Sequence, residues 1–329
     1  LMRKVLVSGY IGFDNFGDEL IFKILKEHLL SLGCEVCALS KNSEYDIKTY
    51  NYKNLIQIIK AIIDCDILIS GGGSLLQNKT SNFSLIYYLS VIFLAKLFFK
   101  KVMIFAQGIE PIKGRFFELL TKNILKMCDF ISLRDEKSQK LLNSWGINSS
   151  LVSDPAFSIT DKIKPYDDKK GIILQLRKVK KISKNFIKDL ASTIILYCKN
   201  INVLALQEDY DREICLEFIN EFKKLGGSAN YNYNKDIDKT IDIINKSEFV
   251  ISTRLHGLIV SRVLKSKTFA LSYDEKIKTL TDELNIANID LYNYNIDELD
   301  KKLKNFFNSE MQCGNHRVFS WDEIDKALI

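Results

Sequence analysis

Short apolar runs alternate with segments of helical periodicity along almost the entire chain. The first run, Lys4–Ser8, has the length of a buried strand, and the spacing of Leu20, Ile24 and Leu25 predicts a helix over Asp18–Leu32. Further strands are predicted at Glu35–Leu39, Ile67–Ser70, Val102–Ala106, Phe130–Leu133 and Ser150–Val152. Helices fit between them at Asn54–Ile63, Ser84–Phe99, Arg115–Met127 and Glu136–Trp145. This rhythm is typical of a parallel sheet with helices on both faces.

A second series of the same kind follows a charged segment over residues 160–170, which lacks apolar periodicity and contains Pro165. Strands are predicted at Ile172–Leu176, Val203–Leu206, Phe249–Ser252 and Thr268–Ser272. Helices are predicted at Ser183–Lys199, Asp211–Leu225, Asp236–Asn245, Gly257–Leu264, Glu275–Leu284, Ile296–Phe307 and Trp321–Ile329. We therefore expect an α/β protein of two doubly wound, Rossmann-like domains, residues 1–160 and 161–329. Such domains are expected to face a central crevice, because ligands bind at the carboxyl ends of parallel strands.

The charged residues exclude one class of partner. The 329 residues include 47 lysines and arginines and 41 aspartates and glutamates, which gives a net charge of +6. Residues 1–160 carry 19 basic and 15 acidic groups, and the remainder carries 28 and 26. So small and mixed an excess argues against nucleic acid, and it fits a small anionic substrate or an anionic membrane surface. Only eight of the 47 basic residues are arginine, so an arginine inside a motif stands out.

The cysteines and the longest apolar segment each have a structural interpretation. Seven cysteines, most of them in apolar runs, are typical of reduced core thiols, and the Cys34-Glu-Val-Cys37 pair has no second pair or histidine cluster with it. The start of the chain reads as a strand rather than a signal peptide, so we expect a cytoplasmic protein. The segment Phe83–Phe99, interrupted by Lys96, is expected to be a buried helix. Alternatively it contacts anionic lipid at the inner face of the cell membrane, with help from Lys96, Lys100 and Lys101.

A glycine-rich segment over residues 9–19 follows the first strand and opens the first helix. It reads Gly-Tyr-Ile-Gly-Phe-Asp-Asn-Phe-Gly-Asp-Glu, which lacks the spacing of a dinucleotide-binding loop. Asp18 and Glu19 would repel a phosphate, but they suit a ligand with hydroxyl groups, which they can hydrogen-bond or deprotonate. The alternative is that Asp18 is the helix N-cap and Glu19 a first-turn acid that interacts with the helix dipole.

Three more predicted strands end in candidate binding residues. Gly-Gly-Gly-Ser at 71–74 can expose backbone N–H groups to an anion, or can simply let two backbones approach. Gln-Gly follows at 107–108. Arg134 stands where a strand meets a helix, and its guanidinium could bind a carboxylate or phosphate. The alternative is a surface pair with Asp135 or Glu136, which contributes ~0–1 kcal/mol.

The sharpest motif is Ser-Thr-Arg-Leu-His-Gly over residues 252–257, at another junction of strand and helix. Arg254 and His256 together indicate anion binding and proton transfer, although His256 could also be a structural histidine. The other histidines, His28 and His316, have no such company, and we interpret His28 as a surface helix residue. Lys276, after the next strand, can reach toward the same strand ends.

Taken in order, these motifs resemble those of the polysaccharide pyruvyl transferases. The resemblance rests on Gly-Phe-Asp-Asn-Phe-Gly-Asp-Glu at 12–19, Gly-Gly-Gly-Ser at 71–74, Gln-Gly at 107–108, Arg-Asp at 134–135, Ser-Asp-Pro at 153–155 and Arg-Leu-His-Gly at 254–257. Enzymes of this family move the enolpyruvyl group of phosphoenolpyruvate onto a sugar as a ketal. The chain is most similar to the type that modifies N-acetylmannosamine in a lipid-linked precursor of a secondary cell-wall polymer. The resemblance implies the two-domain GT-B architecture, which agrees with the two α/β series.

The resemblance also implies roles for individual residues. The donor site is expected to comprise Arg134, Arg254, Leu255 through its backbone, His256 and Lys276. His256 would be the general acid, and Asp18 or Glu19 the base that accepts a proton from a sugar hydroxyl. The acceptor is expected to contact Asp14, Asn15, Gly72, Gly73 and Gln107. Phosphoenolpyruvate would be a co-substrate, with no further cofactor and no metal.

Two other functions remain open from the sequence. One is a nucleotide-sugar glycosyltransferase on the same fold, because fold does not determine function. The other is a non-catalytic protein that binds a sugar or an anion, in which the Arg254–His256 junction serves binding only.

Overall fold

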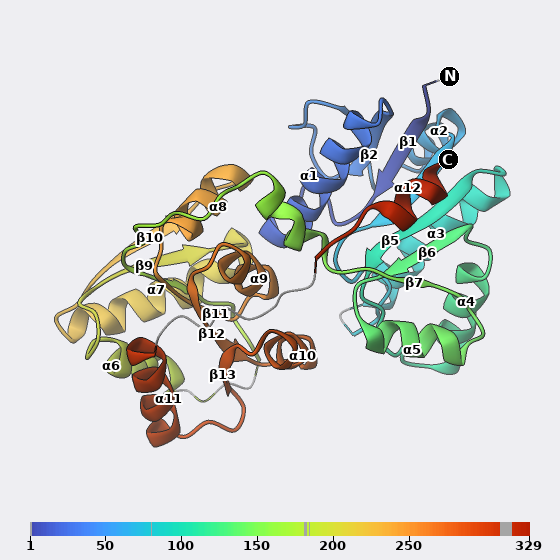
Figure 1. The fold of residues 1–329 in the computed structure, drawn as a ribbon. Helices are drawn as coiled ribbons and strands as arrows, with labels where there is room; N and C mark the ends of the chain where they lie inside the picture. Colours follow the sequence, from blue (N-terminus) through green and yellow to red (C-terminus); the bar gives the residue numbers. More distant parts are fainter. Residues whose placement is uncertain (1, 80, 181–182, 184, 310–317) are drawn as a thin grey trace. The chain divides into compact units, whose positions relative to one another are not determined.

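The computed structural model describes residues 2–79, 81–180, 183, 185–309 and 318–329, and contains two compact units, each built on its own parallel sheet (Figure 1). Unit 1 comprises Leu1–Ser158 and Val318–Ile329, and unit 2 comprises Ile159–Arg317. The first boundary lies close to the predicted one. The last segment differs: the prediction placed residues 161–329 in the second domain, whereas Val318–Ile329 belong to unit 1.

Unit 1 has a seven-stranded sheet in the order β3-β2-β1-β4-β5-β6-β7. The strands are β1 Lys4–Ser8, β2 Glu35–Ser40, β3 Lys48–Asn51, β4 Ile67–Gly71, β5 Lys101–Gln107, β6 Phe130–Leu133 and β7 Ser150–Leu151. From β1 the chain proceeds to one edge and then restarts at β4 on the other side of β1. Loops after β1 and β4 therefore diverge at a topological switch point, where open α/β sheets bind their ligands.

Helices cover both faces of this sheet: α1 Phe16–Ser31, α2 Leu55–Asp64, α3 Asn82–Leu97, α4 Arg115–Leu125, α5 Glu136–Ser144 and α12 Asp322–Leu328 (Figure 1). Side chains of α2 to α5 share one core with Ile104 of β5. The next residue, Phe105, points to the opposite face, where its ring stacks on Trp321 with centroids 5.6 Å apart.

His28 attaches the terminal helix to unit 1. Its ring stacks on Trp321 at 3.6 Å, and its Nε2 lies 2.7 Å from an oxygen of Asp325 in α12. The interpretation of His28 as a surface residue is therefore wrong, because a helix from the far end of the sequence packs over it. His316 lies outside the described residues.

Unit 2 repeats the design with six strands in the order β10-β9-β8-β11-β12-β13, and its switch point lies between β8 and β11. The strands are β8 Ile172–Gln175, β9 Asn200–Ala205, β10 Ser228–Tyr233, β11 Phe249–Ser252, β12 Lys267–Ser272 and β13 Ala287–Asp290. The helices are α6 Phe186–Ile194, α7 Glu208–Lys224, α8 Ile237–Asn245, α9 Leu255–Val263, α10 Glu275–Leu284 and α11 Ile296–Asn308. A 3-10 helix, Pro155–Asp161, lies where the chain passes from unit 1 to unit 2.

The thiols have the character of core residues. The six cysteines among the described residues are free, and Cys313 lies outside that part of the chain. Burial raises the pKa of Cys37 to about 12, the opposite of what a redox-active Cys-x-x-Cys pair needs. Among the described helices, none is long and apolar enough to cross a membrane.

Candidate functional site

The loop between β1 and α1 places two predicted residues at the start of the helix. Asn15, not Asp18, is the N-cap: its Oδ1 accepts from the Gly17 amide at 3.3 Å, and its Nδ2 donates to Asp18 Oδ2 at 2.6 Å. Asp14 precedes it in the left-handed region, with φ of 56°. Asp18 lies in the first turn of α1, where a negative charge interacts favourably with the helix dipole.

Glu19 points the other way and holds the glycine loop. Its Oε1 accepts from the amides of Gly12 at 2.7 Å and Phe13 at 3.2 Å, and its Oε2 accepts from the Tyr45 hydroxyl at 2.6 Å. Burial raises the pKa of Glu19, and these hydrogen bonds oppose the shift. These three hydrogen bonds show that Glu19 stabilises the glycine-rich loop of its own unit. Asp18, in contrast, lies beside the loop that follows β4.

That next loop, after β4, runs against Asp18. Gly72 and Gly73 have φ of 92° and 67°, and a Cβ added to Gly73 would lie 2.3 Å from Asp18 Oδ1. The carbonyl of Gly73 accepts from the Gly108 amide at 3.1 Å, which links the loop to the end of β5. The glycines thus allow the close approach that was one of their two interpretations. The binding of an anion by their backbone N–H groups stays a prediction.

Arg134, at the end of β6, is half-buried, with only 8% of its side chain exposed, and it has two partners. Its Nη1 donates to Asp154 Oδ2 at 2.9 Å, and its Nη2 donates to Ser74 Oγ at 3.1 Å. Asp135 caps α5 by accepting from the Ser138 amide at 2.8 Å. The structure thus gives Arg134 a carboxylate partner that the sequence did not indicate, the aspartate of the Ser-Asp-Pro motif.

Gln107 is fully buried and bridges two strands. Its Nε2 donates to the carbonyl and hydroxyl oxygens of Ser70 at 3.0 and 3.1 Å. Its Oε1 is buried without a hydrogen-bond partner among the described residues. The preceding Ala106 has a φ of 44°, and the register of β5 and β6 shifts here, which turns the end of β5.

These contacts form a continuous chain at the carboxyl ends of the unit 1 strands, which we call the unit 1 cluster. It consists of Asn15, Asp18, Gly73, Ser74, Gln107, Gly108, Arg134 and Asp154. Sequence reasoning gave no role to Ser74 or Asp154, although both stand in motifs of the resemblance.

In unit 2, Arg254 is the N-cap of α9, and its guanidinium is buried against α7. Nε donates to Asp211 Oδ2 at 3.2 Å and Nη2 donates to Asp211 Oδ1, while both terminal nitrogens lie 3.4 Å from Gln207 Oε1. Asp211 also accepts from the amides of Leu206 and Gln207. Burial raises the pKa of Asp211, and the adjacent guanidinium lowers it. Sequence reasoning missed Asp211, because it is one of several acids at the start of an amphipathic helix.

Gln175, at the end of β8, faces the first turn of α9. Its side chain is fully buried, and neither amide atom has a hydrogen-bond partner among the described residues. A Cβ added to Gly257 would lie 1.8 Å from Gln175 Oε1 and 2.7 Å from Ser252 Oγ, so only glycine fits this place in α9. An unpartnered buried amide beside a helix N-terminus is an available hydrogen-bonding group.

A second arginine lies at the same sheet edge. Arg177, two residues after β8, donates to the Tyr273 hydroxyl at 3.3 Å. Burial raises the pKa of Tyr273, and Arg177 and Arg254 both lower it, so two of the chain's eight arginines lie within electrostatic reach of one phenol. Arg177 stands in none of the motifs found in the sequence. Its place beside Tyr273 becomes visible only in the fold, where β8 and β12 run parallel in one sheet.

The remaining predicted donor residues also lie in unit 2. Leu255 and His256 occupy the first turn of α9, both half-buried, and Lys276 occupies the first turn of α10, which Asp274 caps. We define the unit 2 cluster as the residues at these strand ends: Gln175, Arg177, Gln207, Asp211, Arg254, Leu255, His256, Gly257, Tyr273 and Lys276. Arg134, the other predicted donor residue, belongs to unit 1.

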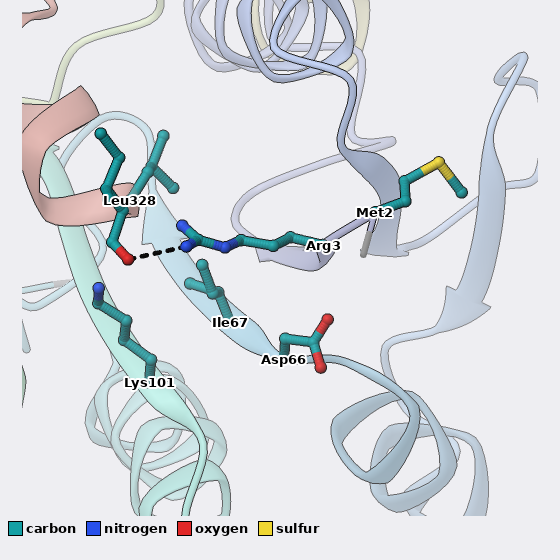
Figure 2. Close-up of a pocket in the computed structure, with 7 residues that line it drawn as sticks. Met2, Arg3, Asp66, Ile67, Lys101 and Leu328 are labelled. Atoms are coloured by element: carbon teal, nitrogen blue, oxygen red, sulfur yellow. Dashed lines mark hydrogen bonds between the residues drawn. The ribbon is translucent and has the colours of Figure 1, made fainter.

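A cavity of about 510 Å³ lies elsewhere, at the amino ends of β1, β4 and β5 (Figure 2). Arg3 crosses it and donates to the carbonyl of Ile329 at 2.8 Å. Its lining includes none of the predicted site residues, and it lies at the opposite edge of the sheet from the unit 1 cluster. In the part of the chain that the structure describes, no group of three His, Cys, Asp or Glu residues could hold a metal ion.

Comparison with solved structures defines the class of protein. The chain is similar to the UDP-GlcNAc 2-epimerase from Methanocaldococcus jannaschii, with a TM-score of 0.65, 14% identity, and 99% of each chain covered. It is also similar to the UDP-GlcNAc 2-epimerase from Neisseria meningitidis bound to UDP-GlcNAc, with a TM-score of 0.61, 11% identity, and 99% of each chain covered. A glycosyltransferase from Rickettsia africae covers 93% of this chain and 88% of its own, with a TM-score of 0.61 and 14% identity. The protein therefore has a two-domain, GT-B-like α/β fold, as the sequence predicted.

The family follows from the sequence itself. Residues 15–275 match the polysaccharide pyruvyl transferase family, so the chain belongs to that family. No curated protein sequence matches the chain closely enough to count as a relative. The matched range contains the whole unit 1 cluster and, apart from Lys276, the unit 2 cluster.

Proposed function

We propose that this chain transfers the pyruvyl group of phosphoenolpyruvate to a sugar, as a cyclic ketal, with release of phosphate. The observation that carries the proposal is the unit 2 cluster within a chain of the pyruvyl transferase family. There the start of α9 combines Arg254, His256 and the positive end of the helix dipole with a second arginine, Arg177.

The unit 2 cluster suits an anion that carries both a carboxylate and a phosphate. First-turn amides of α9 and α10 favour negative charge, and Lys276 and Arg177 add positive charge. Asp211 already balances the charge of Arg254, so Arg254 contributes oriented N–H donors rather than an uncompensated charge. Arg134 remains our proposed donor-binding residue of unit 1, already oriented by Asp154.

The chemistry needs one acid and one base. Protonated His256 gives its proton to the C3 methylene of phosphoenolpyruvate, which becomes a methyl group and leaves C2 electron-deficient. One sugar hydroxyl adds to C2, the C2–O bond to phosphate breaks, and a second hydroxyl of the same sugar closes the ring. The two hydroxyl protons balance the one that C3 gains and the one that the released phosphate takes. General acid catalysis of this kind contributes about 10²–10⁴-fold.

Asp18 is the better candidate for the base. Glu19 is occupied by two amides and a tyrosine hydroxyl, whereas Asp18 contacts Asn15 and the glycine loop that we propose binds the sugar. Asp14, Gly72 and Gln107 would complete the acceptor side. We further propose that the acceptor is N-acetylmannosamine in a lipid-linked cell-wall precursor, at the inner face of the cell membrane.

Phosphate release and mass spectrometry test the proposal together. The purified chain, phosphoenolpyruvate and a synthetic acceptor that contains N-acetylmannosamine should yield phosphate and an acceptor heavier by one pyruvyl ketal. His256→Gln should lower kcat by about 10²-fold or more and retain phosphoenolpyruvate binding in calorimetry. Arg177→Gln should weaken that binding, whereas the control Arg212→Gln changes an exposed arginine of α7 and should have no effect.

The same experiments separate the roles of the two acids. Asp18→Asn should reduce turnover without changing the melting temperature, and Glu19→Gln should reduce the melting temperature because it disturbs the hydrogen bonds to the glycine loop. Normal ketal formation by both His256→Gln and Asp18→Asn would refute the assigned roles.

A nucleotide-sugar substrate is the second candidate, because solved structures with this fold bind UDP-GlcNAc. A thermal-shift comparison decides between them, since a ligand stabilises the protein that binds it. We expect phosphoenolpyruvate to raise the melting temperature and UDP-GlcNAc to leave it unchanged. The reverse result would favour the glycosyltransferase function, and stabilisation without any turnover would favour a binding protein.

A further inference from the structure

The outer surface of unit 1 exposes an unusual number of large apolar side chains on three adjacent helices. Helix α3 packs against both α2 and α4, and all three bury their other side in the same core. We call the exposed set the apolar face: Leu55, Ile56 and Ile63 of α2, Phe83, Ile86, Phe93 and Leu97 of α3, Phe98 and Phe99 of the following turn, and Phe116 and Leu119 of α4.

Helix α3 is apolar on both sides, which is unusual for a helix at a surface. Its inner side chains, such as Leu85, Leu89 and Ile92, are fully buried. Its outer stripe at positions 83, 86, 93 and 97 is apolar too, with Phe83 85% and Leu97 58% exposed. The expectation of a buried helix over Phe83–Phe99 therefore holds for the inner side of α3 but not for its outer side. Apolar patches of this kind mark interaction surfaces.

Phe99 gives an independent indication that this surface is used. It follows the C-cap of α3 with φ of 56°, a left-handed conformation in which glycine is the usual residue. Its amide donates to the Lys96 carbonyl at 3.0 Å, as in a helix-ending turn. Its side chain is 96% exposed, so this phenylalanine strains the backbone without any gain from packing in its own unit.

The charge of the chain is concentrated around the apolar face. Residues 53–64, 82–101 and 113–129 together contain nine lysines and arginines against three acids, an excess equal to the +6 of the whole chain. The charge counts for the two halves of the sequence did not reveal this excess, because the count for residues 1–160 averages the apolar face with the rest of that half. Lys60, Lys113, Arg115 and Lys126 are exposed among or beside the apolar side chains. Lys96 and Lys100, in contrast, have structural partners in Asp129 and in the carbonyls of Ile63 and Cys65.

We propose that the apolar face docks on the surface of an anionic membrane. Exposed aromatic and aliphatic side chains within a basic surround match the acyl boundary and the anionic headgroups of such a membrane. Charge complementarity favours this occupant over a second copy of the chain, because two copies of so basic a surface would repel each other. The proposal does not depend on pyruvyl transfer.

Vesicle flotation of the full chain tests the proposal. Vesicles of phosphatidylcholine with phosphatidylglycerol should recruit the protein, and pure phosphatidylcholine vesicles should recruit it weakly. Lys122→Gln with Lys126→Gln should weaken binding to the anionic vesicles roughly tenfold. The matched pair Lys223→Gln and Lys224→Gln, in the last turn of α7, should leave binding unchanged.

The variant Phe99→Gly distinguishes a loss of vesicle binding from a loss of stability. It relieves the left-handed strain, so the melting temperature should stay equal or rise, while vesicle binding should fall about fivefold. Asn285→Gly is the control, because Asn285 has a φ of 50° at the end of α10 in unit 2. Equal vesicle binding by Phe99→Gly and the parent would overturn the proposal. So would a lack of recruitment, or a dimer in sedimentation analysis that Phe93→Ser dissociates. None of these readouts uses pyruvyl transfer, so they stand apart from the test of the enzyme.

Discussion

Asp211 is the residue whose removal should most weaken unit 2. It is fully buried and accepts hydrogen bonds from the Leu206 amide at 3.1 Å, the Gln207 amide at 3.0 Å, and two nitrogens of Arg254. Asp211→Ala leaves a buried guanidinium without its counter-charge and two amides without an acceptor. Breaking a buried pair in this way costs about 3–5 kcal/mol. For a unit of this size, that loss lowers the melting temperature by roughly 10 °C.

The assay must report on unit 2 itself. Both tryptophans, Trp145 and Trp321, belong to unit 1, so tryptophan fluorescence does not observe unit 2 directly. Far-UV circular dichroism gives the melting temperature, and hydrogen exchange measured by mass spectrometry locates the change. Peptides from α7 and α9 should lose protection in Asp211→Ala. Asp209→Ala, an exposed acid on the same helix, is the control and should behave like the parent.

The double variant Asp211→Leu with Arg254→Met tests the reasoning most directly. It removes both charges, so its loss of stability should be much smaller than the sum of the single losses. Additive losses would show that the two side chains do not form a pair. A loss of under about 1 kcal/mol in Asp211→Ala would likewise refute the claim that the pair is a buried one.

Three other predictions follow from close approaches and thiol pKa values. Gly257→Ala should cost about 1–3 kcal/mol, because its Cβ would lie 1.8 Å from Gln175 Oε1, and a second change, Gln175→Ala, should restore most of the melting temperature. Gly73→Ala should lower turnover by displacing the Asp18 carboxylate, 2.3 Å from the new Cβ; Gly33→Ala has a similar positive φ with nothing nearby, and equal losses of activity in both would refute the contact. At pH 8.5 in the native state, mass spectrometry should find slow iodoacetamide labelling at the thiols whose pKa burial raises to about 11 or 12: Cys37, Cys65, Cys128 and Cys215. Their thiolate fractions should lie roughly a hundredfold to a thousandfold below that of a free cysteine.

The sequence predicted most of the fold because most elements are buried on one side and show it in their periodicity. Strands with continuous apolar runs, such as β4, lie where they were expected. β3, β10 and β13 were missed, because they lie at or next to sheet edges and have few buried side chains. The place of the terminal helix was also unpredictable, since only tertiary packing brings Trp321 onto His28.

Residues of the candidate site could be predicted only where a side chain that can bind or react stands within a recognisable sequence motif. Arg134 and Arg254 stand out because this chain contains few arginines, and the structure gives each a carboxylate partner that sequence reasoning did not name. Asp154 and Asp211 lie 20 and 43 residues away from their arginines, and no local pattern encodes such distances. The roles assigned to His256 and Lys276 remain predictions of the family resemblance.

The two ion pairs suggest how the proposed donor site of this chain can be specific although two of its arginines are already balanced by aspartates. An unpaired arginine attracts any anion, including free phosphate, and the attraction increases with the charge of the anion. An arginine already balanced by an aspartate binds well only a ligand whose oxygens match its remaining N–H groups in direction, because little net attraction is left. Arg134 with Asp154 and Arg254 with Asp211 both have this arrangement. If the pairs select by direction, Asp211→Asn should strengthen the binding of inorganic phosphate relative to phosphoenolpyruvate, because it frees charge while it keeps the shape of the side chain. Calorimetry with both ligands measures that ratio, and an unchanged ratio would show that Asp211 only stabilises the fold.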